Sequence, residues 1–141
     1  MTALQETGPS VPSSDKSTVR VAVVFGGRSG EHTISCATAA GVLSAIDRDR
    51  YEVLPVGITP EGQWLLVEDD PAALELSDNR PPVTITAEGL GQGRLTAPLG
   101  GGELTVLGPT GPEALGQVDV VLPLLHGPYG EDGTIQGMLE M

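Results

Sequence analysis

Residues 21–31 read Val-Ala-Val-Val-Phe-Gly-Gly-Arg-Ser-Gly-Glu, an apolar run that stops at two glycines. A continuous apolar run of mostly β-branched residues is typical of a strand covered on both faces in a parallel sheet. A helix is expected next, from about Glu31 to Ile46, with Ile34, Val42, Ala45 and Ile46 on one side of it. Tyr51 to Ile58 is the following strand. Strand, helix and strand form a βαβ unit, which predicts a doubly wound α/β fold with a mainly parallel sheet and flanking helices.

The remaining helices and strands are predicted from less regular sequence patterns. A short hairpin strand is expected at Gln63–Val67, one or two helical turns at Asp70–Leu76, and β-like pieces at Val83–Thr86 and Leu104–Leu107. Val118–Leu125 is apolar apart from Asp119 and predicts another buried parallel strand, followed by a helix at Thr134–Met141. Met1–Thr18 is rich in Ser, Thr, Pro and Gly and is expected to be a disordered tail. The folded domain is therefore expected to span 19–141.

Composition and charge exclude several classes of protein. The chain has 19 acidic and seven basic residues, a formal net charge of −12, which disfavours nucleic acid and anionic membranes as partners. Cys36 is the one cysteine, so an intramolecular disulfide framework and Cys-rich metal sites are excluded. No apolar run is long enough to span a membrane, and the first residues do not resemble a signal peptide. These observations predict a cytoplasmic protein.

The first loop with candidate chemistry joins the strand at 21–25 to the helix after it. Small residues let a ligand approach the backbone, and the free N–H groups of the first helical turn point toward it. Glu31 stands at this point, where a carboxylate would oppose a pyrophosphate and suits an ammonium group. The alternative is that Glu31 only complements the positive end of the helix dipole. The spacing G-x-G-x-x-G is absent, which makes a dinucleotide-binding Rossmann domain an unfavoured reading.

The second loop, residues 126–137, reads His-Gly-Pro-Tyr-Gly-Glu-Asp-Gly-Thr-Ile-Gln-Gly and also lies between a strand and a helix. Loops at the carboxyl ends of neighbouring parallel strands meet at one crevice, so the two loops are expected to face each other. His126 could donate to a carboxylate or a phosphoryl oxygen, or be a half-buried structural histidine. Asp132 is expected to cap the last helix, while Glu131 and Tyr129 are open between a structural and a functional role. Cys36 is expected to be inert core.

Together the two loops resemble the N-terminal domain of D-alanine–D-alanine ligases, enzymes of the ATP-grasp group. The first loop is similar to the family's Gly-Gly-x-Ser-x-Glu-His motif with Ser35 following, and the second matches its His-Gly-x-x-Gly-Glu-Asp-Gly signature. The resemblance spans Val19 to the end and is loosest over 69–116. It implies a Rossmann-like, pre-ATP-grasp domain. It also implies that Glu31 contacts the first D-alanine near its ammonium group, that His126 lies beside its reacting carboxyl, and that Gly127 is a backbone neighbour.

The resemblance also implies a reaction, cofactors and partners. In the family, ATP phosphorylates the first D-alanine and the second amino group attacks the acyl phosphate, giving the dipeptide for peptidoglycan, ADP and phosphate. ATP and Mg²⁺ are held by ATP-grasp domains that are absent from this chain, and such ligases are commonly homodimers. Because the groups that hold ATP and Mg²⁺ lie in those domains, the chain is expected to be inactive alone. Met138–Met141 continues a helix without a stop signal, so the chain is expected to end within an element.

Two other functions remain open from the sequence. One is a D-alanine–D-lactate or D-alanine–D-serine ligase, because the residues that choose the second substrate lie outside this chain. The other is a stand-alone α/β module that binds a small molecule without catalysis. A titration with amino acids and nucleotides would test the second function. Measurable ATP turnover by the isolated chain would contradict the expectation that it is inactive alone.

Overall fold

The computed structural model describes residues 18–89, 91–96, 103–108 and 111–140. Apart from Thr18, the predicted tail Met1–Thr18 lies outside the described residues. The elements, in chain order, are β1 (Val19–Gly26), α1 (His32–Ala45), β2 (Tyr51–Ile58), β3 (Trp64–Val67), α2 (Pro71–Leu74), β4 (Gly91–Thr96), β5 (Glu103–Gly108), β6 (Gly111–Gln117), β7 (Val120–Pro123) and α3 (Thr134–Glu140). The predicted βαβ unit is therefore present as β1, α1 and β2.

The described strands form a mixed sheet of seven in the order β6-β5-β4-β3-β2-β1-β7. β1 pairs in parallel with β2 and with β7. The other four pairings, from β2 through β6, are antiparallel. The α/β class and flanking helices are as predicted, but the expectation of a mainly parallel sheet is wrong. Only five residues separate β2 from β3, too few for the crossover that a parallel pair needs. β3 and β4 also pair antiparallel, across a longer connection that contains α2.

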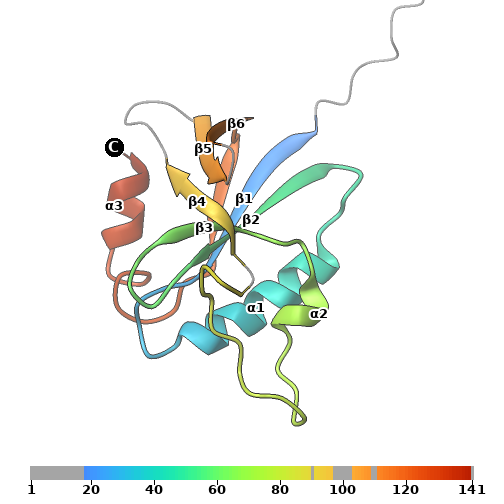
Figure 1. The fold of residues 1–141 in the computed structure, drawn as a ribbon, viewed down its shortest axis with the longest axis vertical. Coiled ribbons are helices and arrows are strands. Elements are labelled where there is room, and N and C mark those ends of the chain that lie inside the picture. The colour runs from blue at the N-terminus through green and yellow to red at the C-terminus, as the bar shows by residue number, and fades with distance from the viewer. Residues whose placement is uncertain (1–17, 90, 97–102, 109–110, 141) are drawn as a thin grey trace, which may run out of the picture.

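Two apolar clusters lie on the two faces of β1, whose side chains alternate between them. On one face, Val21, Val23 and Phe25 pack against α1, α2 and Ile85. On the other face, Ala22 and Val24 pack with Leu95 of β4 and Val106 of β5, so the antiparallel strands curl over the sheet. Figure 1 shows α1 and α2 together on one side of the molecule and α3 apart from them. The carboxyl end of β1 is thus held from both faces.

The face of α1 that packs on the sheet differs from the predicted one. Its buried residues include Cys36, Ala39, Ala40 and Leu43, whereas Ile34 is 51% exposed. Small side chains let the helix approach the sheet closely, and close packing there outweighs the larger apolar residues that turn outward. The bounds of the helix agree with the prediction, but its orientation does not.

Two segments near the site also differ from expectation. Residues 83–86 form no strand; instead Ile85 is fully buried and its N–H donates to the Nε2 atom of His32 at 3.0 Å. β7 is shorter than the predicted 118–125 and pairs only with β1, so Val120 is 47% and Leu122 is 37% exposed within the described residues. The predicted buried strand is therefore an edge strand in this structure.

Candidate functional site

The first loop leaves β1 through two glycines with left-handed backbone angles, Gly26 at φ 88° and Gly27 at φ 96°. A side chain at Gly26 would place its Cβ 2.5 Å from the carbonyl oxygen of Ile58, which excludes any residue but glycine there. The N–H of Gly27 donates to that same carbonyl at 2.8 Å. The loop is therefore anchored on the end of β2 before it reaches Glu31.

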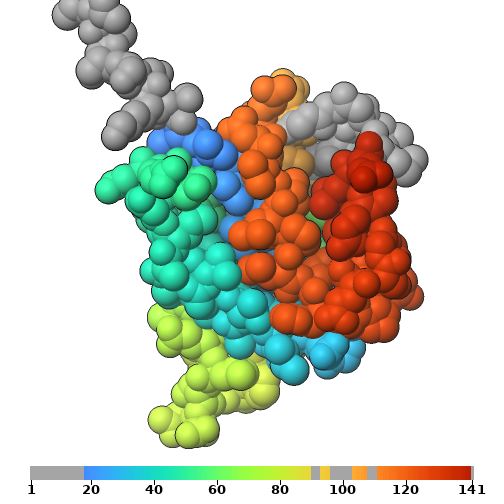
Figure 2. All heavy atoms as spheres, turned by 180° about the vertical axis from the view of Figure 1, so that it is seen from behind, coloured from blue at the N-terminus to red at the C-terminus, as the bar shows by residue number. Residues whose placement is uncertain are grey.

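The second loop lies directly against the first. Figure 2 shows the segment that follows β7, in orange-red, in contact with the start of α1, in light blue. The Ser29 hydroxyl donates to the carbonyl oxygen of His126 at 2.7 Å and accepts from the N–H of Glu31 at 3.1 Å. The structure thus brings the two loops to one rim of the sheet, as the βαβ topology predicts.

Glu31 directs its carboxylate across this junction. A Cβ built on Gly127, whose φ is 72°, would lie 2.6 Å from the Oε2 atom of Glu31. Glu31 is exposed and sits at the N-cap of α1, yet its side chain makes no capping hydrogen bond. A capping role therefore does not account for its position, and the carboxylate is free to contact a ligand beside Gly127.

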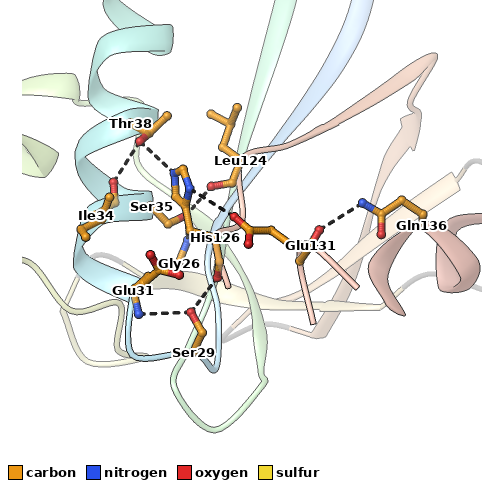
Figure 3. A network of polar contacts seen from close by, with 11 residues as sticks. Gly26, Ser29, Glu31, Ile34, Ser35, Thr38, Leu124, His126, Glu131 and Gln136 are labelled. Atoms are coloured by element: carbon orange, nitrogen blue, oxygen red, sulfur yellow. Dashed lines mark hydrogen bonds and ion pairs between the residues drawn. The ribbon is translucent and has the colours of Figure 1, made fainter. Parts of the chain in front are cut away.

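His126 lies in the same cluster as Glu31 (Figure 3). Its Nε2 atom is 3.1 Å from the Thr38 hydroxyl, and its Nδ1 atom is 4.0 Å from the Oε1 atom of Glu131. The side chain of His126 is 33% exposed and that of Glu131 is 63% exposed. All three residues singled out in the sequence, Glu31, His126 and Gly127, are therefore neighbours.

Besides Ser29, three residues that support the site were not assigned roles from the sequence. Ser35, fully buried, accepts from the N–H of Gly26 at 2.9 Å and donates to the carbonyl of Leu124 at 2.6 Å. His32, also buried, lies with its Nδ1 atom 2.7 Å from the carbonyl oxygen of Gly27. The third is Thr38. The sequence does contain a pattern that predicts two of these roles. Glu31, Ser35 and Thr38 are polar residues at helical spacing, so they lie on one side of the helix, facing the second loop.

The second loop carries its own internal supports. The carboxylate of Asp132 accepts from the N–H of Thr134, the first residue of α3, at 3.1 Å and from the N–H of Tyr129 at 3.2 Å. A hydrogen bond from the Thr134 side chain has the largest effect on the pKa of Asp132, and the two backbone hydrogen bonds add to it. All three lower that pKa. Tyr129 has a left-handed φ of 71°, and the Arg28 guanidinium lies 5.0 Å from the centre of its ring. Asp132 therefore orders the start of α3, as predicted.

A cavity of about 190 Å³ opens beside the cluster, between the two loops and α3. His126 belongs to its wall as well as to the polar cluster, and most of the remaining lining is apolar. The apolar and aromatic part of the wall includes Ile58, Trp64, Leu125, Tyr129, Ile135 and Met138. A small ligand held by Glu31 and His126 would thus have an apolar wall on one side.

Cys36 is unreactive core. It is fully buried in the described structure and forms no disulfide. Burial raises the pKa of its thiol to about 12, since the low-polarity surroundings disfavour the thiolate. It is not a nucleophile in this site.

The described residues contain neither a membrane-spanning helix nor a metal-binding cluster. None of the helices in the described part of the chain has the length and apolar character needed to cross a bilayer. Across the same ranges, no three His, Cys, Asp or Glu side chains converge in a way that could hold a metal ion.

Comparison with known proteins gives a consistent result. Residues 20–141 match the family described as D-ala D-ala ligase N-terminus. The chain is 54% identical over 123 residues to the D-alanine–D-alanine ligase of Mycobacterium avium (strain 104), a match that covers 87% of this chain and 33% of the relative. It is 56% identical over 128 residues to that of Kineococcus radiotolerans, covering 86% of this chain and 33% of the relative. The chain spans about a third of the length of these relatives.

Solved structures agree with this match. The VanG D-Ala:D-Ser ligase from Enterococcus faecalis superposes with a TM-score of 0.71 at 27% identity, covering 87% of this chain and 33% of that one. The D-alanine-D-alanine ligase from Coxiella burnetii gives a TM-score of 0.66 at 29% identity with the same coverage. By sequence and by fold, this chain belongs to the D-ala D-ala ligase N-terminus family.

Proposed function

We propose that residues 19–141 form the wall of the first D-alanine site in an ATP-dependent D-alanine–D-alanine ligase. The observation that carries the proposal is the meeting of the two loops, with the Glu31 carboxylate packed on Gly127 beside the imidazole of His126. A carboxylate and an imidazole at one junction match the two charged ends of a small amino acid. Glu31 would bind the ammonium group, and His126 would donate to the carboxylate.

The contribution of this chain is binding and orientation. The Ser29 bridge fixes the separation of the two loops, and the glycines at 26, 27 and 127 leave no side chains between the ligand and the backbone. Holding the carboxyl group of D-alanine in one orientation removes part of the entropy cost of its later reaction. The apolar cavity wall excludes water from one side of the bound amino acid.

ATP and Mg²⁺ belong to the proposed reaction but are not assigned to residues described here. The described residues hold no cluster of three metal-binding side chains, so they do not fit a resident Mg²⁺. ATP serves as the phosphoryl donor in the proposed reaction.

The test uses a chimera in which this chain replaces the matching third of the Mycobacterium avium ligase. Glu31→Gln should raise the KM for D-alanine about 10- to 100-fold, because a charge-assisted hydrogen bond contributes about 1.5–3 kcal/mol. The KM for ATP should stay within about twofold. Glu61→Gln is the matched control, an exposed carboxylate in the turn after β2. Unchanged D-alanine kinetics in Glu31→Gln would remove the assigned role.

The identity of the second substrate follows the more similar relatives. The relatives that are 54% and 56% identical are both named D-alanine–D-alanine ligases, and this supports D-alanine as the second substrate. The rival function, a stand-alone binding module, predicts that the isolated chain binds an amino acid or a nucleotide tightly. A calorimetric titration of this chain with D-alanine, L-alanine and ATP separates the two, since one wall of a site should bind each only weakly.

Location in the cytoplasm and a homodimeric assembly are part of the same proposal. A free, buried thiol with no disulfide is compatible with a reducing compartment. Light scattering after size-exclusion chromatography of the chimera tests the dimer, and a monomer at micromolar concentration would contradict it.

A further inference from the structure

The Thr38 hydroxyl is placed between two polar atoms of different kinds. Its oxygen lies 3.0 Å from the carbonyl oxygen of Ile34, one turn earlier on α1, and 3.1 Å from the Nε2 atom of His126. A hydroxyl has one hydrogen to donate and two lone pairs that accept. A carbonyl oxygen cannot donate, so the Thr38 hydrogen goes to Ile34. The bond to His126 must then be supplied by the imidazole.

We propose that Thr38 is a positioning residue that holds His126 with its proton on Nε2 and leaves Nδ1 as the nitrogen offered to a ligand. This inference rests on the proposed function, because it names how the ligand-facing side of His126 is selected. Nδ1 is 4.0 Å from the nearest Glu131 oxygen, which is too far for a hydrogen bond. Figure 3 shows the ring between α1 and the second loop, with Thr38 on the helix side.

The assignment determines how His126 can serve a carboxylate ligand. With Nε2–H committed to Thr38, a neutral ring presents only a lone pair at Nδ1. The ring donates to a carboxylate from Nδ1 only as the imidazolium. Glu131 then lies on the same side of the ring as the Nδ1 proton.

The second histidine of the chain provides an internal reference. The Nε2 atom of His32 accepts the N–H of Ile85 at 3.0 Å, so the proton of that ring must be on Nδ1, 2.7 Å from the carbonyl of Gly27. His32 and His126 should therefore be opposite tautomers within one molecule. This contrast needs no external standard, because the chain has only these two histidines.

Nitrogen-15 spectra of the histidine rings test the tautomers directly in this chain, at a pH where both rings are neutral. His126→Asn assigns the signals by removing one set. The expected result is Nε2–H for His126 and Nδ1–H for His32, with Thr38→Val shifting His126 toward a mixture while His32 stays unchanged. Thr38→Ser should keep the wild-type pattern. Finding His126 as Nδ1–H in the wild type, or unmoved by Thr38→Val, would overturn the inference.

Kinetics in the chimera separate this inference from the proposed function. Thr38→Val should lower kcat/KM for D-alanine about fivefold, the usual value of one neutral hydrogen bond. Thr38→Ser should restore activity to within about twofold, and Thr33→Val on the same helix controls for helix propensity. If His126→Asn impairs turnover but Thr38→Val does not, the positioning role fails. If neither does, the proposed role of His126 fails while the tautomer result stands on its own.

Discussion

Replacing Ser35 by alanine removes one buried atom that holds the ends of two parallel strands in place. The Ser35 hydroxyl accepts from the N–H of Gly26 in β1 and donates to the carbonyl of Leu124, just after β7. Both backbone groups lose a partner in the variant, and the space left by one oxygen is too small for a water molecule. An unpaired buried backbone group costs about 1–3 kcal/mol. The two groups together cost about 2–6 kcal/mol. Alanine regains about 0.5 kcal/mol of helix propensity, so the net loss should be about 1.5–5.5 kcal/mol.

The assay is urea denaturation followed by far-UV circular dichroism. A loss of this size is a large part of the roughly 5–15 kcal/mol that stabilises a typical domain, so the midpoint should fall clearly while the slope stays constant. Ser44→Ala, at an exposed position on α1, is the matched control and should stay within about 0.5 kcal/mol of wild type. If Ser35→Ala unfolds at the same urea concentration as Ser44→Ala, the two hydrogen bonds do not hold the strands.

Three further predictions concern buried or capping groups. Burial raises the pKa of Cys36 from 9.0 to about 12, so the thiol of the unfolded chain ionises at lower pH than that of the folded chain. The free energy of unfolding should therefore fall as pH rises from about 9 to 12. Urea denaturation at several pH values measures this fall, and Cys36→Ala should abolish it. Hydrogen bonds from the Thr134 side chain and the N–H groups of Tyr129 and Thr134 lower the pKa of Asp132. Its contribution is present at neutral pH and should be lost as pH falls below about 3.8, whereas Asp132→Asn should show a flatter acid limb. His32→Leu leaves two buried backbone groups unpaired and should cost at least about 2 kcal/mol in the same denaturation assay, and a smaller loss would contradict the assigned bonds.

The β1-loop-α1-β2 unit could be predicted from sequence because each part has a local signal. β1 is a continuous apolar run, the two glycines stop it, and β2 repeats the pattern. β4 and β6 have no such signal, since each begins with glycine and is poor in β-branched residues. They are held by side chains that reach the second apolar cluster, Leu95 in β4 and Leu115 in β6. Tertiary packing, which a local pattern does not contain, makes them strands.

The candidate site divides in the same way. The meeting of Glu31, His126 and Gly127 follows from strand ends that share one edge of a sheet, so topology alone predicts it. The roles of Ser29 and Ser35 do not follow, because each bonds a backbone carbonyl far away in sequence, 97 and 89 residues respectively. A hydroxyl's partner depends on the final backbone path, and this path is known only once the sheet is assembled.

Trp64 gives the molecule a built-in optical probe. It is the one tryptophan in the chain, and its indole forms part of the wall of the cavity that His126 also lines. Tryptophan fluorescence of this protein therefore comes from one residue at the rim of the sheet, with no contribution from a second tryptophan. Molecules that enter the cavity can be followed by light alone, in the unlabelled protein and on the timescale of mixing.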